Sequence, residues 1–204
     1  MWKPTKPPFA SYKKTVFAKS AKVADIVYQI GEYDALRKPS QEVPLDNITS
    51  PDMQKKFAYL KKRLLLYRKR TGYGRGIAAV QVGIPERFVV TYTPEGLLLL
   101  INPVITKKSQ SLLRYSEGCM SAGAIFAPVV RPAWIAFEYY NEKGGKQLWD
   151  TKDDTSIGRM LNRVFQHEID HLEGIINIDK VQGHELFLDS DPEFYATSRF
   201  APVK

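Results

Sequence analysis

Two histidines and a glutamate stand at the spacing of a metal-binding helix. His167, Glu168 and His171 form the pattern H-E-x-x-H, and residues four apart lie one turn above each other on a helix. Both imidazoles can therefore bind one metal ion, while Glu168 lies beside them and can take the proton of a metal-bound water. Because burying a glutamate beside two imidazoles without a metal would be costly, we interpret the pattern as a metal centre rather than as two core histidines.

The two histidines leave this metal centre one protein ligand short. In the extended protease pattern H-E-x-x-H-x-x-G-x-x-H, the chain keeps Gly174 but has Asn177 in place of the third histidine, which excludes that class. Glu185 or Glu193 downstream would instead complete a zinc endopeptidase. The better candidate lies upstream, in the segment that contains Cys119, the single cysteine of the chain.

Three segments of the chain carry a family resemblance. Residues 74–81 read G-R-G-I-A-A-V-Q, residues 117–121 read E-G-C-M-S, and residues 166–171 read Q-H-E-I-D-H. In this order and approximate spacing they resemble the peptide deformylase motifs G-x-G-x-A-A-x-Q, E-G-C-x-S and Q-H-E-x-D-H. The resemblance extends from about Val23 to Asp179.

The resemblance implies a hydrolase that removes the N-formyl group from the initiator methionine of nascent polypeptides and releases formate. It makes Cys119 the third ligand of one divalent ion, beside His167 and His171. The family favours Fe²⁺, while the ligand types also suit Zn²⁺, Ni²⁺ or Co²⁺. Glu168 would pass the proton of the attacking water to the departing amine.

The resemblance also assigns residues around the reacting formyl group. The side-chain amide of Gln81 and the main chain of Met120 would stabilise the oxyanion. Gly76 would let the substrate backbone approach closely. Glu117 and Arg131 are expected to form a buried ion pair that braces the cysteine segment.

The chain departs from the family around the substrate cleft. Arg75 stands where an apolar residue is usual, Met120 replaces a common leucine, and Asn162 replaces a small alanine on the metal helix. Residues 122–126, A-G-A-I-F, replace a proline-rich segment and resemble versions from eukaryotic organelles. These changes leave open whether the activity is reduced or the substrate preference is altered.

Helical periodicity predicts two helices. Ser50 as N-cap and Pro51 in the first turn begin a helix that ends near Gly72. A second helix, from about residue 156 to 173, carries the metal motif and ends before Gly174, which tolerates positive φ.

The second helix has an inward stripe. Met160, Val164, His167 and His171 fall within roughly 60° of one another, so both histidines point inward. We expect Met160 and Val164 to form the apolar pocket for the methionine side chain, with ordinary core as the alternative interpretation. Three further residues are expected to widen the apolar face: Ile157, Leu161 and Leu172.

Turn signals predict two hairpins. Residues 88–92 pair with 97–101 across Pro-Glu-Gly, and residues 134–140 pair with 146–151 across Asn-Glu-Lys-Gly-Gly. The predicted fold class is α+β, with antiparallel or mixed sheets packed around the H-E-x-x-H helix.

The length of 204 residues predicts one domain with two tails. We expect a basic, flexible arm at 1–22, a deformylase-like domain at 23–183 and a tail at 184–204. The net charge is +8, and the arm holds six lysines. The arm could contact the ribosome through RNA phosphates. Beside the deformylase and the zinc endopeptidase, a third hypothesis is therefore a non-enzymatic relative that binds RNA. We expect no DNA partner.

Compartment signals are few. A single cysteine allows no intramolecular disulfide, and the apolar runs fall short of the roughly 20 residues that a membrane span needs, so we expect no transmembrane segment. The basic arm resembles the remnant of an organelle-targeting segment. We therefore favour the mitochondrion or another organelle, with the cytoplasm as the alternative.

Overall fold

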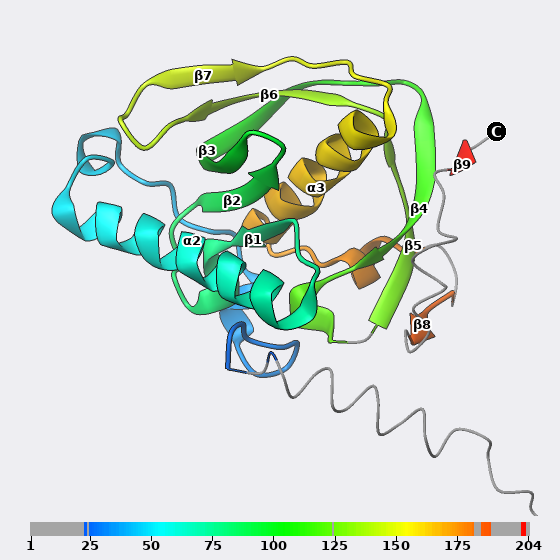
Figure 1. Cartoon of the computed structure of the whole chain (residues 1–204), viewed down its shortest axis with the longest axis horizontal. Coiled ribbons are helices and arrows are strands. Elements are labelled where there is room, and N and C mark those ends of the chain that lie inside the picture. The colour runs from blue at the N-terminus through cyan, green and yellow to red at the C-terminus, as the bar shows by residue number, and fades with distance from the viewer. Residues whose placement is uncertain (1–22, 24, 124, 182–184, 189–200, 203–204) are drawn as a thin grey trace, which may run out of the picture.

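The structure is a computed structural model that describes residues 23, 25–123, 125–181, 185–188 and 201–202 (Figure 1). The predicted basic arm at 1–22 lies outside the described residues, as does most of the predicted tail at 184–204. The domain boundaries at both ends therefore stay predictions. No helix in the described part of the chain has the length and apolar character needed to cross a membrane.

The described residues form two antiparallel sheets. The first has the order β1-β2-β3-β6-β7, with bounds Gly76–Ala78, Phe88–Thr93, Gly96–Lys108, Ile135–Tyr140 and Lys146–Trp149. The second has the order β8-β5-β4-β9, with bounds Phe187–Leu188, Ile125–Pro132, Leu112–Gly118 and Ala201–Pro202. The predicted α+β class is confirmed, and its sheets are antiparallel.

Two helices cover opposite faces of the first sheet. In Figure 1, α2 (Pro51–Thr71) crosses one side of β1 and β2, while α3 (Ser156–Leu172) runs through the middle of the molecule. Strand β2 is buried on both faces, because Phe88 and Val90 pack in the core with α2 whereas Val89 packs in the core with α3. The metal motif therefore lies on an enclosed helix.

Helix α2 follows its local signals. The Ser50 hydroxyl accepts a hydrogen bond from the Met53 N–H at 3.3 Å, Pro51 occupies the first turn, and Gly72 closes the helix at φ 77°. One stripe of the helix is buried against β1 and β2: Met53, Phe57, Leu60 and Leu64. Both predicted ends of this helix are confirmed.

Strand β3 is longer than predicted. It continues past Ile101 to Lys108, although Asn102 and Pro103 interrupt the apolar run. A register shift against β6 absorbs the interruption, and Asn102 takes φ 48° while its side-chain amide exchanges two hydrogen bonds with the backbone of Val43. Both predicted hairpins are present. Strands β4 and β5, which hold the cysteine segment between them, were not predicted.

Helix α3 is present as predicted, with one error on its apolar face. Thr155 caps its first turn by accepting a hydrogen bond from the Gly158 N–H at 3.1 Å. Gly174 has φ 74°, and a Cβ there would lie 2.6 Å from the Arg37 carbonyl carbon, so both conformation and space require glycine. Leu161 and Leu172 are buried, but Ile157 is 54% exposed because it belongs to the first, solvent-facing turn.

Candidate metal centre and substrate pocket

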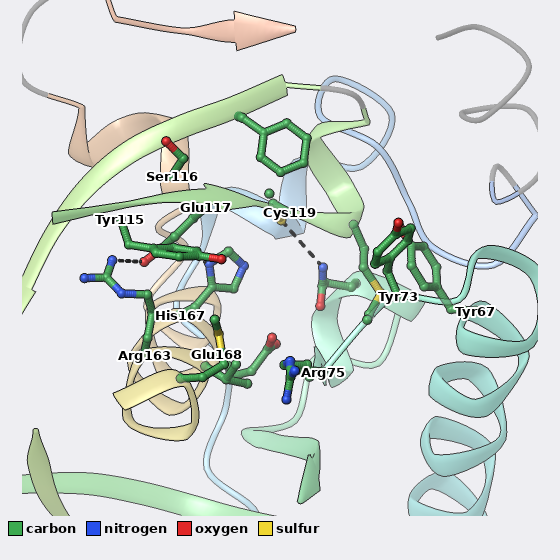
Figure 2. Close-up of a pocket in the computed structure, with 18 of the residues that line it drawn as sticks. Tyr67, Tyr73, Arg75, Tyr115, Ser116, Glu117, Cys119, Arg163, His167 and Glu168 are labelled. Atoms are coloured by element: carbon green, nitrogen blue, oxygen red, sulfur yellow. Dashed lines mark hydrogen bonds and ion pairs between the residues drawn. The ribbon is translucent and has the colours of Figure 1, made fainter. Parts of the chain in front are cut away.

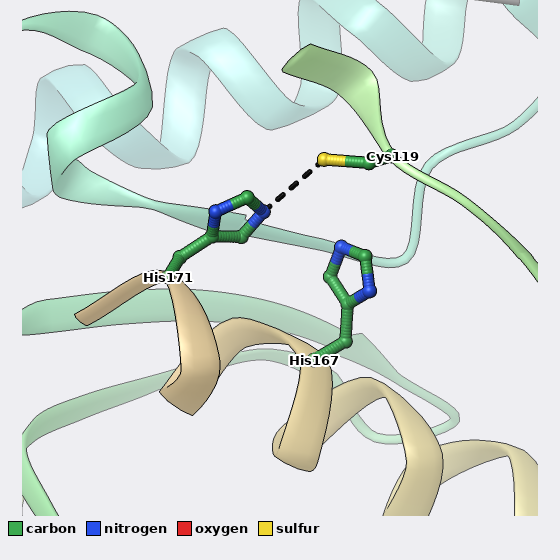
Figure 3. A group of neighbouring side chains, drawn as sticks. All are labelled: Cys119, His167 and His171. Carbon is green, nitrogen blue, oxygen red and sulfur yellow. Dashed lines mark hydrogen bonds between the residues drawn. The ribbon is translucent and has the colours of Figure 1, made fainter. Parts of the chain in front are cut away.

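Three potential ligand atoms converge from two segments. Cys119 follows β4, and His167 and His171 project from one side of α3 toward it (Figure 3). One ligand atom from each residue lies within 4.8 Å of the others, and the Cys119 Sγ is 3.2 Å from the His171 Nε2. The structure thus brings together the three residues that the resemblance made ligands.

A buried carboxylate orients His167. The Glu117 Oε2 lies 3.1 Å from the His167 Nδ1, which leaves the Nε2 of that ring available to a metal. Arg131 donates to both Glu117 oxygens, at 2.6 and 2.9 Å, so the predicted ion pair is confirmed. Burial by itself raises the pKa of Glu117, but Arg131 and His167 outweigh burial and hold that pKa well below its usual range.

Arg163, on α3, is a second cation on the same carboxylate. Its Nη1 donates to the Glu117 Oε1 at 2.5 Å, and it also bonds the carbonyls of Val129 and Leu113 at 3.1 and 2.6 Å. These contacts tie α3 to β4 and β5. Arg163 was not among the residues predicted from the sequence, although its place one turn before His167 was a usable signal.

Glu168 is buried beside the ligands. Burial raises its pKa to about 7, and its Oε2 has no hydrogen-bond partner among the described residues. A Cβ at Gly76 would lie 2.4 Å from the Glu168 Oε1. Residue 76 must therefore be glycine to leave space for the carboxylate of Glu168. The sequence prediction gave a different reason for this glycine, the close approach of the substrate backbone.

The donor set fits one divalent ion. Metal–sulfur and metal–nitrogen bonds of about 2.3 and 2.0 Å in a tetrahedral site separate ligand atoms by roughly 3.5 Å, comparable to the observed convergence. A thiolate and two imidazoles leave a fourth position for water or substrate. Glu185, the alternative ligand, is exposed and pairs with Arg114, while Glu193 lies outside the described residues. The endopeptidase alternative has no support in this geometry.

Gln81 points its amide nitrogen toward the cysteine. The Oε1 accepts from the Ala78 N–H at 2.8 Å, and the Nε2 donates to the Ser121 hydroxyl at 3.0 Å and lies 3.9 Å from the Cys119 Sγ. These bonds fix which end of the amide faces the centre. The carbonyl of Met120 accepts a hydrogen bond from the Gln29 side chain at 3.0 Å, which holds the peptide group between Met120 and Ser121.

A pocket of about 310 Å³ opens onto this centre. Its lining includes every residue predicted to act on or bind the substrate: Gly76, Gln81, Met120, Met160, Val164 and Glu168. Arg75 also lines the pocket and is exposed. Gly123 and Phe126 line it from the unusual 122–126 segment, of which residue 124 is not described. Asn162 does not line the pocket; it accepts a hydrogen bond from the Ile135 N–H at 3.0 Å and so holds β6.

The pocket is more polar and aromatic than predicted from the sequence. Figure 2 shows Tyr115 and Arg163 on the side of the pocket that carries His167, with Tyr67 and Tyr73 on the opposite side. The Arg163 guanidinium lies 5.6 Å from the Tyr115 ring centroid. Tyr115 stands two residues before the cysteine motif and could have been found from that position. Tyr67 and Tyr73 carry no comparable signal.

The family model for polypeptide deformylase matches residues 25–186. A peptide deformylase of Desulfitobacterium hafniense is 37% identical over 156 residues, which cover 76% of this chain and 95% of that protein. A peptide deformylase of Picosynechococcus is also 37% identical, over 62% of this chain and 66% of that protein. The chloroplastic peptide deformylase 1B of rice is 37% identical over 53% of this chain and 40% of that protein.

Solved structures share the fold. The peptide deformylase of Thermotoga maritima superimposes with a TM-score of 0.65 at 30% identity and covers 77% of this chain and 97% of that chain. A Synechococcus elongatus peptide deformylase, solved in complex with actinonin, gives a TM-score of 0.64 at 28% identity over 78% of this chain and 79% of that chain.

Proposed function

The chain belongs to the polypeptide deformylase family and its activity is that of a deformylase, and we propose that the centre formed by Cys119, His167 and His171 removes the formyl group from N-formyl-methionyl nascent chains. The observation that carries this proposal is the convergence of the three ligand atoms within 4.8 Å. Glu168 lies buried beside them, and a pocket of substrate size opens onto it.

In this proposal each residue at the centre has a separate role in the hydrolysis. When bound, a divalent ion supplies a Lewis acid and lowers the pKa of water that it holds. Glu168 takes the proton of the attacking water and gives it to the departing amine. The Gln81 Nε2 and the Met120 backbone N–H donate to the oxygen of the formyl group as negative charge develops there. Glu117 keeps the His167 ring in the orientation that ligation requires.

The pocket receives the first side chain of the substrate. Met160 and Val164 offer apolar surface for the methionine, and Gly76 keeps space open between β1 and Glu168. Tyr115 and Arg163 add a polar wall, so the preference for methionine over other first residues is set by more than apolar contact.

The proposal extends to the native metal, the compartment and a ribosome contact. We favour Fe²⁺ as the native ion, with Zn²⁺, Ni²⁺ or Co²⁺ as substitutes that suit the same ligands. We place the enzyme in an organelle, the mitochondrion in particular; the chloroplastic rice relative supports an organelle in general. The six lysines of residues 1–22 would give a ribosome contact.

Formate release from a formyl-methionyl peptide tests the catalytic assignment. Protein prepared anaerobically with Fe²⁺ should release formate and leave internal peptide bonds intact. Cys119→Ala should lose the metal, whereas Glu168→Ala should keep the metal and lose about 10²–10⁴-fold in rate. Metal content and circular dichroism separate ligand loss from unfolding. Normal metal binding and turnover in Cys119→Ala would overturn the ligand set, and peptide-bond cleavage without formate would favour an endopeptidase.

A further inference from the structure

Helix α2 carries eight Lys and Arg residues and one acid, Asp52. Five of the eight bind partners within the described part of the chain. Lys56 pairs with Asp52 and Glu86, Lys61 with Glu142, and Arg70 with Asp25, while Arg63 donates to the Ile26 carbonyl and Arg68 to the Gly74 carbonyl.

The remaining three cations are Lys55, Lys62 and Lys69. All three are exposed, and no ion pair is recorded for them among the described residues. They are seven residues apart, so each lies within about 20° of the one before it when viewed down the helix axis. The three therefore form one row, with about 10.5 Å of helix between neighbours. This lysine row lies opposite the buried stripe that contains Phe57 and Leu60.

The carboxylates around α2 do not neutralise the lysine row. Asp25, Glu86 and Glu142 are each bound to a different cation of the helix. Tyr59 and Leu65, 44% and 45% exposed, lie beside the row and are the exposed large apolar side chains of this helix. The outer face of α2 is therefore a positively charged strip about 21 Å long, too long for its ammonium groups to share one small anion.

We propose that the lysine row binds the phosphate backbone of RNA. A polyanion matches regularly spaced cations along a line, because each ammonium can neutralise a separate phosphate and release its counterions. A membrane surface fits less well, because the continuous apolar stripe of α2 is buried in the core. The choice of RNA over DNA rests on the proposed function, whose substrate emerges from an RNA-rich machine.

The same helix borders the substrate pocket. Tyr67 lines the pocket near the C-terminal end of α2, and Figure 2 shows it facing the catalytic residues. RNA held on the outer face of α2 would lie across the helix from this tyrosine, because residue 67 is about 140° around the helix from Lys62. The pocket and the RNA would then contact different sides of the same helix.

The test compares two triple variants of the full chain. Lys55→Gln, Lys62→Gln and Lys69→Gln neutralise the row, while Lys107→Gln, Lys108→Gln and Lys152→Gln remove as many exposed lysines elsewhere. Binding to a labelled RNA hairpin is followed by fluorescence anisotropy between about 50 and 200 mM salt. The lysines of residues 1–22 remain in every protein, so differences report the row alone.

We expect the row variant to lose roughly tenfold or more in RNA affinity and its salt slope to fall by about 2–3, while the control keeps both. Unchanged affinity and slope in the row variant, or equal losses in the two variants, would overturn the proposal. So would a loss of binding to phosphatidylserine vesicles with RNA binding intact. Release of formate from a short formyl-peptide should stay at the wild-type rate in both variants. If the wild-type protein released no formate, the proposed function would be contradicted. The comparison of RNA binding between the two variants would still be valid.

Discussion

The two helices of this protein use charge in opposite ways. Helix α2, 21 residues long, buries four apolar side chains in one stripe and turns its cations outward. Helix α3, 17 residues long, buries polar side chains as well, because strands of both sheets enclose it. Its buried polar residues are Asn162, Arg163, Gln166, Glu168 and His171.

The buried polar groups of α3 fall into two kinds, those that are hydrogen-bonded to strands and those at the metal centre that are not. Arg163, Asn162 and Gln166 each hydrogen-bond strand backbone, so burial of these groups is compensated. On this helix the buried polar atoms without a hydrogen-bond partner in the described residues are the Glu168 Oε2 and the His171 Nδ1. The unmet hydrogen-bonding capacity of the enclosed helix is thus concentrated at the metal centre.

Breaking the charge network around α3 should have the largest effect on stability. Glu117→Gln leaves Arg131 and Arg163 buried with one fewer negative charge, so we expect the free energy of unfolding to fall by about 3–5 kcal/mol. Urea unfolding measures this. Glu138→Gln, which removes an exposed partner of Lys146, should stay within about 0.5 kcal/mol of wild type. Equal losses in the two variants would contradict the comparison.

A smaller effect is expected where α3 supports β6 without charge. Asn162→Ala removes the acceptor of the Ile135 N–H, and a buried donor left without a partner costs about 1–3 kcal/mol. Thermal and urea unfolding should show this loss. Because Asn162 does not line the pocket, KM for a formyl-methionyl peptide should remain at the wild-type value. A stable variant with a raised KM would instead make Asn162 part of the cleft.

Removing the N-cap of α2 should reduce stability by a smaller amount still. Ser50→Ala loses the hydrogen bond to the Met53 N–H, and removal of an N-cap costs about 1 kcal/mol. Ser50→Asp keeps an acceptor and serves as the control, with stability restored to near the wild-type value. If alanine and aspartate unfold at the same urea concentration, the cap contributes nothing to this helix.

The outer face of α2 should be the least sensitive region for folding. Lys62→Gln changes an exposed side chain with no recorded ion pair among the described residues, so stability should stay within about 0.5 kcal/mol. Urea unfolding at low and high salt provides the measurement. A larger loss at low salt would reveal an ion pair and would remove Lys62 from the lysine row.

Local signals predicted most of the helical structure and the two hairpins. Ser50 and Gly72 mark the ends of α2 by capping chemistry that depends on neighbouring residues alone. Strand β3 was cut short in the prediction because Asn102 and Pro103 read as a break. In the structure the strand continues through a register shift against β6 and is held there by the hydrogen bonds of Asn102 to Val43, and both involve partners distant in sequence.

The sequence by itself determined which residues are candidates for the metal ligands and the general base, because H-E-x-x-H places its groups by helical spacing and the motif around Cys119 suggests the third ligand by resemblance. Tertiary structure alone decided the rest of the pocket. Arg163 meets Glu117 across 46 residues of sequence, and Tyr67 faces the centre from the other helix. Such contacts depend on how helices and sheets pack, which the short-range spacing of residues does not encode.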